Sequence, residues 1–432
     1  MQIWKSKIVQ GISAIATGDL LGKALTFFAF AYLSRVLSPV YIGVIGFGSA
    51  LTGLLKPIVD YGLGIVGTRD VARDPRRLTE YTLHITLMRA FLAVAAIALC
   101  MTIVALSSQY AGERNVLFLF AFGLVLPTFS YSWAYQALGK FQWFAVEKII
   151  LGTVYCGMIL LWVRNDSGLA VVPAAIIVSG AVSQGLVMLG FFRYRWTRPA
   201  VVDSRVFRSI FSSSAPFFVS GQVSQISVYA ASFYLGVSSK GEDVGYFFAA
   251  FKFYSLVDIL SNLLWSTFYP ILARYSSERS STVRIFSLYF TSTALITIPM
   301  GLFGIYFARD IMVLLYGPAY GAAAEYFRWL IVAAFFQLFG SAFLRALPAF
   351  GKDRIYFKVS VTIAVISVVV GIAMTNLLGT MGAAVSYGLS QFAGFVLSVI
   401  VFQSVLRVPY SRSLMITLLC TVISFGAIVL LG

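Results

Sequence analysis

Five basic side chains stand inside long apolar stretches of this sequence, where a charge is costly. They are Lys23, Lys56, Arg89, Lys252 and Arg345. A charged side chain near the centre of a bilayer costs about 2.5 to 3.5 kcal/mol, so it normally faces a water-filled cavity or a partner. Cations gathered around one cavity attract phosphate and carboxylate groups. These residues are therefore candidates for binding an anionic substrate.

Acidic residues occupy comparable positions at Asp19, Asp60 and Asp258. Residues four apart share a helical face, so Asp19 can pair with Lys23 and Asp60 with Lys56. A carboxyl in a membrane cavity can also have a raised pKa and so take up and release protons near neutral pH. Asp60 and Asp258 are thus candidates for ion coupling, with a fixed ion pair as the alternative.

No acid lies four residues from Arg89, Lys252 or Arg345, which favours a cavity role for them. The alternative for Arg89 and Lys252 is that the long side chain reaches a headgroup at the membrane surface. Aromatic residues such as Trp133 and Tyr135 could stack on sugar rings in the same cavity, although an interfacial belt explains most of them.

Residues for other chemistry are scarce. Cys100, Cys156 and Cys420 are scattered without metal-like spacing, and His84 is the only histidine. No catalytic constellation emerges, and the longest polar gap is the basic stretch 193–208. The sequence therefore predicts no catalytic residue, metal site or cofactor, and protons or sodium ions are the coupling ions that Asp60 and Asp258 would take.

The composition indicates the kind of fold that must hold these charges. Charged residues make up 11% of the chain and hydrophobic residues 59%, whereas a soluble domain carries about 25% charged residues. The net charge of +16 could suggest nucleic acid, but the basic residues sit mostly in short gaps between apolar runs. A nucleic-acid binder would instead gather them on one solvated face. The chain is predicted to be an all-α membrane protein that binds no nucleic acid.

Twelve apolar stretches approach or exceed the roughly 20 residues needed to cross a bilayer. The first half holds 9–34, 41–67, 81–106, 114–138, 143–163 and 169–192, and the second half holds 210–237, 244–272, 283–308, 325–347, 355–377 and 381–406. A last apolar run, 414–431, predicts a thirteenth crossing or an interfacial tail. The expected domains are a bundle over 1–192, a basic linker over 193–209, a second bundle over 210–406 and an apolar segment over 407–432.

The loop charges orient the chain. With the N-terminus inside, 21 basic residues fall on the inner side, Lys148 among them, and five fall outside. Because lysine and arginine concentrate in cytoplasmic loops, the N-terminus is predicted to be cytoplasmic.

The two halves also resemble each other. Gly18-Asp19 corresponds to Gly221-Gln222, and Gln136-Ala137-Leu138-Gly139-Lys140 corresponds to Pro348-Ala349-Phe350-Gly351-Lys352. Many transporter folds are built from repeated bundles. Both copies start on the same side, so the repeat is predicted to be parallel.

Several short motifs resemble a known family when they are taken in order. Asp60-Tyr61-Gly62-Leu63-Gly64 is followed by Thr68-Arg69-Asp70-Val71-Ala72-Arg73, which is similar to the family's aspartate-glycine turn and basic cytoplasmic loop. Further matches are Gln136 to Phe141, Val244 to Phe247 and Gly379 to Ala384. Together they resemble Wzx-type O-antigen and polysaccharide flippases of the multidrug/oligosaccharidyl-lipid/polysaccharide exporter superfamily.

This resemblance implies two six-helix bundles in a V, located in the bacterial cytoplasmic membrane. It implies alternating access that carries an undecaprenyl-diphosphate-linked oligosaccharide from the cytoplasmic to the periplasmic leaflet. It also implies a cationic lumen, onto which Lys23, Lys56, Lys252 and Arg345 map. Membrane lipids, a polysaccharide polymerase and a chain-length regulator are the partners expected.

Three alternatives remain open at this stage. A lipid II flippase would share the same features. A cation-coupled multidrug antiporter of the superfamily would have acids dominating the cavity, and a membrane glycosyltransferase or polymerase would have a catalytic loop.

Overall fold

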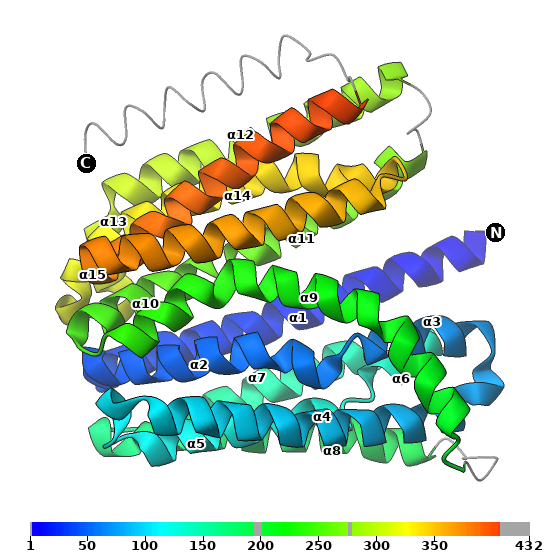
Figure 1. Ribbon diagram of the computed structural model, residues 1–432, viewed down its shortest axis with the longest axis horizontal. Helices are drawn as coiled ribbons and strands as arrows, with labels where there is room; N and C mark the ends of the chain where they lie inside the picture. Colours follow the sequence, from blue (N-terminus) through cyan, green and yellow to red (C-terminus); the bar gives the residue numbers. More distant parts are fainter. Residues whose placement is uncertain (1, 194–200, 275–278, 407–432) are drawn as a thin grey trace. The chain divides into compact units, whose positions relative to one another are not determined.

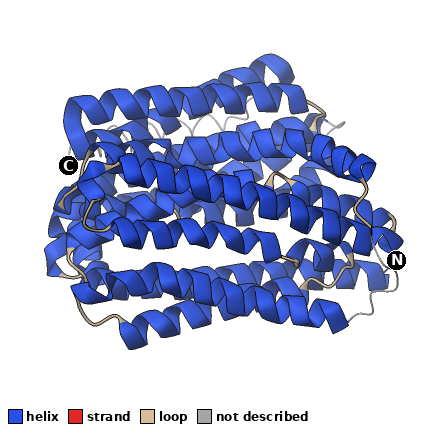
Figure 2. Cartoon of the chain, turned by 60° about the horizontal axis from the view of Figure 1, so that its bottom comes forward, coloured by secondary structure: helices blue, strands red, loops and turns tan. Residues whose placement is uncertain are grey.

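The computed structural model describes residues 2–193, 201–274 and 279–406, and these residues form helices and no strand (Figures 1 and 2). The apolar run 414–431 and residues 194–200 of the linker 193–209 lie outside this part of the chain. Two compact units divide the sequence, Met1–Gln225 and Ile226–Gly432. The predicted bundle boundaries stay a prediction, since the division falls inside one long helix.

The first unit consists of long helices interrupted by short ones. Its elements are α1 (Gln2–Val36), α2 (Pro39–Asp60), α3 (Leu63–Arg73), η1 (Pro75–Arg77), α4 (Leu78–Leu106), η2 (Ser108–Tyr110), α5 (Arg114–Phe122), η3 (Gly123–Phe129), α6 (Ser132–Ala137), α7 (Gln142–Trp162), η4 (Asp166–Ala170) and α8 (Val171–Arg193). Helix α9 (Ser204–Ser238) starts in this unit and ends in the second.

Two of the predicted spans in this unit are broken helices. Tyr61 and Gly62 both adopt left-handed backbone conformations, with φ of 48° and 74°, and they separate α2 from α3. In the span 114–138, a 3-10 segment that contains Pro127 separates α5 from α6. Proline removes a backbone donor and disfavours the regular α-helix. The breaks place polar side chains at helix ends inside the bundle.

The second unit is arranged around one helix. Its elements are α10 (Glu242–Tyr254), α11 (Val257–Arg274), α12 (Arg279–Tyr306), α13 (Ala308–Tyr316), η5 (Pro318–Ala322), α14 (Ala323–Ala349) and α15 (Asp353–Leu406). Helix α14 packs against α10, α11, α12, α13 and α15. Most of its side chains are buried, so α14 forms the centre of this unit.

Helix α15 contains two predicted spans. Its 54 residues would extend about 80 Å as one straight helix, well beyond a hydrocarbon core of about 30 Å. Gly379 has non-helical backbone angles, φ 60° and ψ −135°, and divides the element into two helices. The division agrees with the predicted spans 355–377 and 381–406.

The two units share one helix-ending motif at corresponding positions. Gly139 and Gly351 both have φ of 69°. The N–H of Lys140 donates to the Tyr135 carbonyl at 2.8 Å, and the N–H of Lys352 donates to the Leu347 carbonyl at 3.0 Å. A left-handed glycine followed by this long-range bond is the Schellman motif. The local structure thus supports the repeat predicted from these segments.

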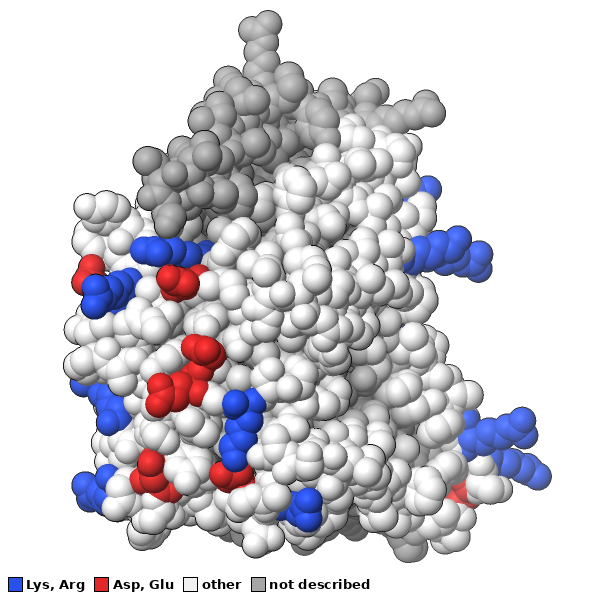
Figure 3. All heavy atoms as spheres, turned by 60° about the vertical axis from the view of Figure 1, so that its left-hand side comes forward, with Lys and Arg blue, Asp and Glu red and all other residues white. Residues whose placement is uncertain are grey.

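Apolar side chains cover much of the surface. Phe91, Leu106 and Leu295 are 75%, 79% and 71% exposed. On the face shown in Figure 3, uncharged residues occupy most of the described surface and charged side chains gather toward two margins. Among the described residues, eight helical stretches are long and apolar enough to cross a membrane. Such extensive apolar exposure is expected of a surface that contacts lipid.

Candidate functional site

An ion pair inside the first unit joins the end of α2 to α4. Asp60 is the last residue of α2, and Arg89 lies in the middle of α4. The Arg89 guanidinium binds the Asp60 carboxylate and also donates from Nη1 to the Ser130 carbonyl at 3.0 Å. The Arg89 side chain is only 4% exposed, whereas that of Asp60 is 42% exposed. The arginine is therefore the buried member of the pair.

This pairing differs from the one that helical spacing predicted. The sequence offered Lys56 as the partner of Asp60 and no partner for Arg89. The structure pairs Asp60 with Arg89, because the left-handed Tyr61 ends α2 and leaves the carboxylate facing α4. Among the described residues, Lys56 has no carboxylate oxygen within 4.0 Å. Asp60, the acid nearest to Lys56 in the sequence, is bound to Arg89.

A second polar chain continues from the same place. The Ser130 and Ser132 hydroxyls lie 3.4 Å apart, and Ser132 donates a hydrogen bond to Glu147 on α7. Glu147 is 3% exposed, and its Oε1 lies 3.9 Å from Nζ of Lys148. Sequence reasoning missed Glu147 as a buried acid. A signal was present, since an acid six residues into an apolar helix needs a partner.

Lys56 lies on α2, one helical turn before Asp60. Lys56 itself is exposed in the described structure. Of the predicted binding residues, the first unit therefore holds Arg89 in an ion pair and Lys56 at an exposed position one turn from Asp60.

The predicted pair on α1 is present. Nζ of Lys23 lies 2.8 Å from the Asp19 carboxylate. One residue earlier, Gly22 packs so closely on α7 that an added Cβ would lie 2.7 Å from the Lys148 carbonyl oxygen. Glycine permits this close approach of two helices in a membrane. The contact holds the Asp19 and Lys23 segment beside α7.

Two predicted binding residues belong to the second unit. Lys252 lies on α10 and Arg345 on α14, and these helices pack against each other. Both side chains are half-buried. Asp258 belongs to α11, but its side chain lies outside the described part of the chain.

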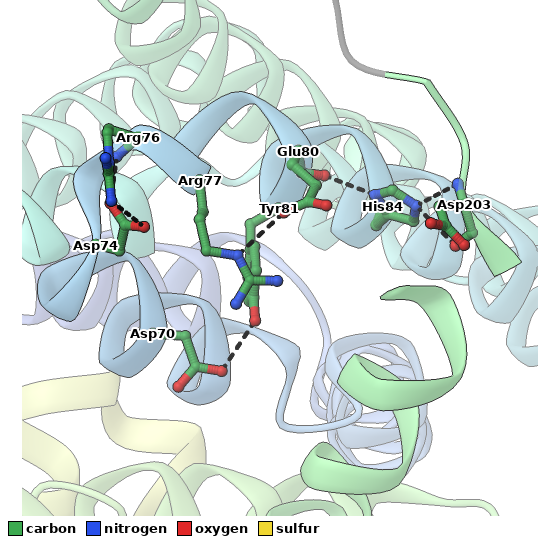
Figure 4. Close-up of polar contacts among 8 residues, drawn as sticks. All are labelled: Asp70, Asp74, Arg76, Arg77, Glu80, Tyr81, His84 and Asp203. Carbon is green, nitrogen blue, oxygen red and sulfur yellow. Dashed lines mark hydrogen bonds and ion pairs between the residues drawn. The ribbon is translucent and has the colours of Figure 1, made fainter. Parts of the chain in front are cut away.

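The basic loop after α3 forms a polar network with its neighbours (Figure 4). The Tyr81 hydroxyl donates to Asp70 at 3.1 Å, and Arg77 donates to Glu80 at 3.1 Å. At the end of α3, Arg76 donates to Asp74 at 2.9 Å and holds the pKa of that carboxyl below its usual range. The loop is therefore cross-linked to the start of α4, and its arginines are partly neutralised.

The single histidine ties this loop to the segment that enters α9. His84 is fully buried, and its Nδ1 lies 2.7 Å from the Glu80 carbonyl oxygen. The N–H of Asp203 donates to His84 Nε2 at 3.0 Å (Figure 4). These contacts fit the tautomer that carries its proton on Nδ1. His84 is thus a structural residue that links parts of the first unit far apart in sequence.

The aromatic residues Trp133 and Tyr135 do not line a sugar site. They are 5% and 0% exposed and belong to the core of the first unit. The Tyr135 hydroxyl donates to the Val187 carbonyl at 3.0 Å, and its ring stacks on Trp143. Tyr135 thus packs α6 against α7 and α8, whereas the Trp133 ring packs over Gly67 of α3.

Apolar helices of membrane-crossing length, with charges held inside a bundle, define a multi-pass membrane protein. The chain belongs to the family of polysaccharide biosynthesis proteins, whose profile matches residues 8–276. This family assignment confirms the resemblance seen in the motifs.

Curated relatives agree with the family. The chain is 20% identical over 373 residues to a putative O-antigen transporter of Escherichia coli (strain K12), covering 84% of this chain and 88% of the relative. It is 25% identical over 280 residues to the EPS I polysaccharide export inner membrane protein EpsE of Ralstonia nicotianae (strain ATCC BAA-1114 / GMI1000), covering 61% and 63%.

Solved structures show the same fold. The lipid II flippase MurJ in an inward closed conformation matches with a TM-score of 0.72 at 12% identity, covering 96% of this chain and 97% of that chain. An inward-facing multidrug resistance MATE family transporter of the MOP superfamily matches with a TM-score of 0.71 at 12% identity, covering 89% and 94%. The predicted fold class is therefore confirmed.

Proposed function

We propose that the protein is a flippase rather than an enzyme, and that it moves an undecaprenyl-diphosphate-linked oligosaccharide from the cytoplasmic to the periplasmic leaflet. Membership of the polysaccharide biosynthesis family and the fold shared with a lipid II flippase support a transport role. The substrate class rests on charge. A diphosphate is the anionic group that a cationic site in a membrane would bind most strongly.

The position of Lys56 is the observation that carries the proposal. It stands near the middle of the helical stretch 39–73, and the acid one turn away is bound to Arg89. A diphosphate that enters this water-poor region would gain a charge-assisted hydrogen bond from the lysine and offset its charge. Lys23, Arg89, Lys252 and Arg345 are the other residues that we propose to contact the substrate.

Alternating access follows from differential binding. A substrate that contacts cations of both bundles would stabilise the conformation in which they are closest, and so shift the equilibrium between inward- and outward-open states. Asp60 and Asp258 are our candidates for ion coupling. Protonation of Asp60 would remove its attraction for Arg89 and free the guanidinium.

Complementation of a flippase-deficient bacterial strain tests the function. The variants Lys56→Glu, Lys252→Glu and Arg345→Glu should abolish glycan export, while the corresponding Ala variants should only reduce it. Lys352→Glu, at an exposed position before α15, is the matched control and should export normally. If all three Glu variants reach the membrane and export normally, the cationic site is not used in transport.

Two further readouts belong to the same strains. A cysteine placed at Ser204 reports the orientation of the chain. We infer that the N-terminus and this segment are cytoplasmic, so the cysteine should react with a membrane-impermeant label only after the cells are permeabilised.

Export measured across pH in Asp60→Asn and Asp258→Asn tests ion coupling. A pH dependence unchanged in both variants would remove the ion-coupling role. A glycosyltransferase or polymerase activity in the purified protein would argue for the enzyme alternative.

A further inference from the structure

The break between α2 and α3 is held by two aromatic side chains of α9. The Tyr61 ring stacks on that of Phe211, with centroids 4.3 Å apart, and on that of Phe218, with centroids 4.7 Å apart. Both pairs are nearly parallel, and such stacking contributes free energy beyond the area it buries. Phe211 and Phe218 are about two turns apart on α9, so the Tyr61 ring lies between them. We call this arrangement of three rings the aromatic clamp.

Backbone contacts accompany the clamp. Gly62 has φ of 74°, and a Cβ added there would lie 2.6 Å from Cβ of Phe217 and 2.9 Å from the Ser214 carbonyl oxygen. Glycine permits this close approach. Nearer the middle of α2, Nε2 of Gln222 donates to the Leu54 carbonyl at 3.1 Å. Helix α9 therefore contacts α2 both at the break and before it.

Tyr61 holds a backbone conformation that a tyrosine rarely adopts. Its φ is 48°, and within the described part of the chain it is the one non-glycine residue with a positive φ. A residue with a Cβ in the left-handed region costs free energy, so the surrounding structure must hold it there. The stacked rings of Phe211 and Phe218 supply part of that stabilisation. The form of the break thus depends on α9.

The clamp acts on the residue that precedes it. Asp60 ends α2, and its carboxylate binds Arg89 on α4. Tyr61 sets the direction in which the chain leaves α2, so a change at Tyr61 would alter the position of the Asp60 carboxylate relative to α4. An ion pair with a buried arginine is sensitive to such a displacement, because its attraction must offset the cost of desolvation.

Helix α9 can bend close to the clamp. Pro216 lies between Phe211 and Phe218 in the sequence and removes one backbone hydrogen bond from the helix. Sharp bends in helices occur mostly at such positions. The helix starts in the first unit and ends at Ser238 in the second. A movement of α9 would therefore reach the clamp directly.

We propose that Tyr61 is a positioning residue that transmits the position of α9 to the ion pair of Asp60 and Arg89. The inference rests on the ion-coupling role proposed for Asp60, and it adds the route by which this pair responds to a helix that continues into the second unit. It requires the clamp and the ion pair to stabilise each other. Because coupling is reciprocal, loss of either must lower the contribution of the other.

A double-mutant cycle measures this coupling, with reversible unfolding of the purified full-length protein in a denaturing detergent as the readout. Asp60→Asn alone should lower the folding equilibrium constant roughly 100-fold. In the Phe211→Leu background the same change should lower it only about tenfold, because the weakened clamp no longer holds Asp60 at Arg89.

Phe207→Leu is the matched control. Phe207 lies one turn before Phe211 on the same helix, and the two side chains are 37% and 38% exposed. The structure stacks Phe211, not Phe207, on Tyr61. The effect of Asp60→Asn should therefore stay roughly 100-fold in this background. An equal reduction in both backgrounds would mean that α9 is loosened in general, and the inference would be wrong.

Variants at position 61 separate the ring from the backbone. Tyr61→Phe keeps the ring and should keep the full coupling. Tyr61→Gly suits the left-handed backbone but removes the ring, so the protein should fold while the effect of Asp60→Asn falls to about tenfold. If Tyr61→Gly leaves that effect at its wild-type size, the ring is not the link and the proposal is overturned.

The export assay decides the proposed function separately. If export keeps its pH dependence in Asp60→Asn, the ion-coupling role of Asp60 fails, whatever the unfolding cycle shows. If that pH dependence changes while the cycle of Asp60 and Phe211 is additive, only the positioning role of Tyr61 fails. A cycle that is non-additive for Phe211→Leu and Tyr61→Gly, and additive for Phe207→Leu, supports the inference.

Discussion

The two units have matching helix ends but different interiors. In the first unit, Asp60, Arg89 and Glu147 form ion pairs and hydrogen bonds across α2, α4, α6 and α7. The second unit is built instead on an aromatic core around α14. Its buried phenylalanines are Phe286, Phe290, Phe335, Phe336, Phe339, Phe343, Phe395 and Phe402.

This contrast shows which properties a repeated bundle retains and which it can change. The Schellman motifs at Gly139 and Gly351 depend on a few consecutive residues, so both copies keep them. Interior side chains have no such local constraint. A core can be polar or aromatic provided that its groups are packed and satisfied. The first unit adds this polar network to a core of its own that includes Trp133 and Tyr135, so we expect its stability to depend on charge as well as on volume, and that of the second unit mainly on volume.

The largest effect is expected in the aromatic core. Phe290 is 1% exposed, and its ring centroid lies 4.6 Å from that of Phe343. Phe290→Ala would leave a cavity and should lower the free energy of unfolding by about 4 kcal/mol. Phe303→Ala removes a ring that is 59% exposed and should cost little. Reversible unfolding in a denaturing detergent measures both. Equal losses would contradict the packing role assigned to this core.

A somewhat smaller effect should follow from breaking the ion pair of the first unit, and it should be asymmetric. Asp60→Asn leaves the buried Arg89 charge without its partner and should cost about 3 kcal/mol. Arg89→Met leaves Asp60, whose side chain is 42% exposed and can still be hydrated, so the cost should be about 1 kcal/mol. The same unfolding assay compares them. A larger loss in Arg89→Met would mean that Asp60 is the less hydrated partner.

The smallest effect tests the repeat itself. Gly139→Ala and Gly351→Ala place a side chain in the left-handed region, although open space surrounds both positions. Each should cost about 1 kcal/mol, and the two losses should be alike. Gly157→Ala, which also meets open space but lies within α7, should be neutral or stabilising. A loss at only one of the two turns would show that the motifs are not equivalent.

The sequence by itself determined the class of protein, most of the helices and several of their ends. A low proportion of charged residues and apolar runs of bilayer length specify membrane helices, because every backbone polar group must be satisfied within the helix. The turn at Gly139 could be predicted because a left-handed glycine acts through its own backbone. The pair of Asp19 and Lys23 could be predicted because helical spacing alone brings them together.

Only the tertiary structure decided which charges meet. Arg89 pairs with Asp60, 29 positions away in the sequence, and Glu147 accepts a hydrogen bond from Ser132 on another helix. Helical periodicity gives the face on which a side chain lies but not the helix that packs against that face. The break at Tyr61 and the depth of Lys148 in α7 also depend on neighbouring helices. Long-range packing therefore made Glu147, an acid that helical spacing did not single out, part of the polar chain that includes Ser130 and Ser132.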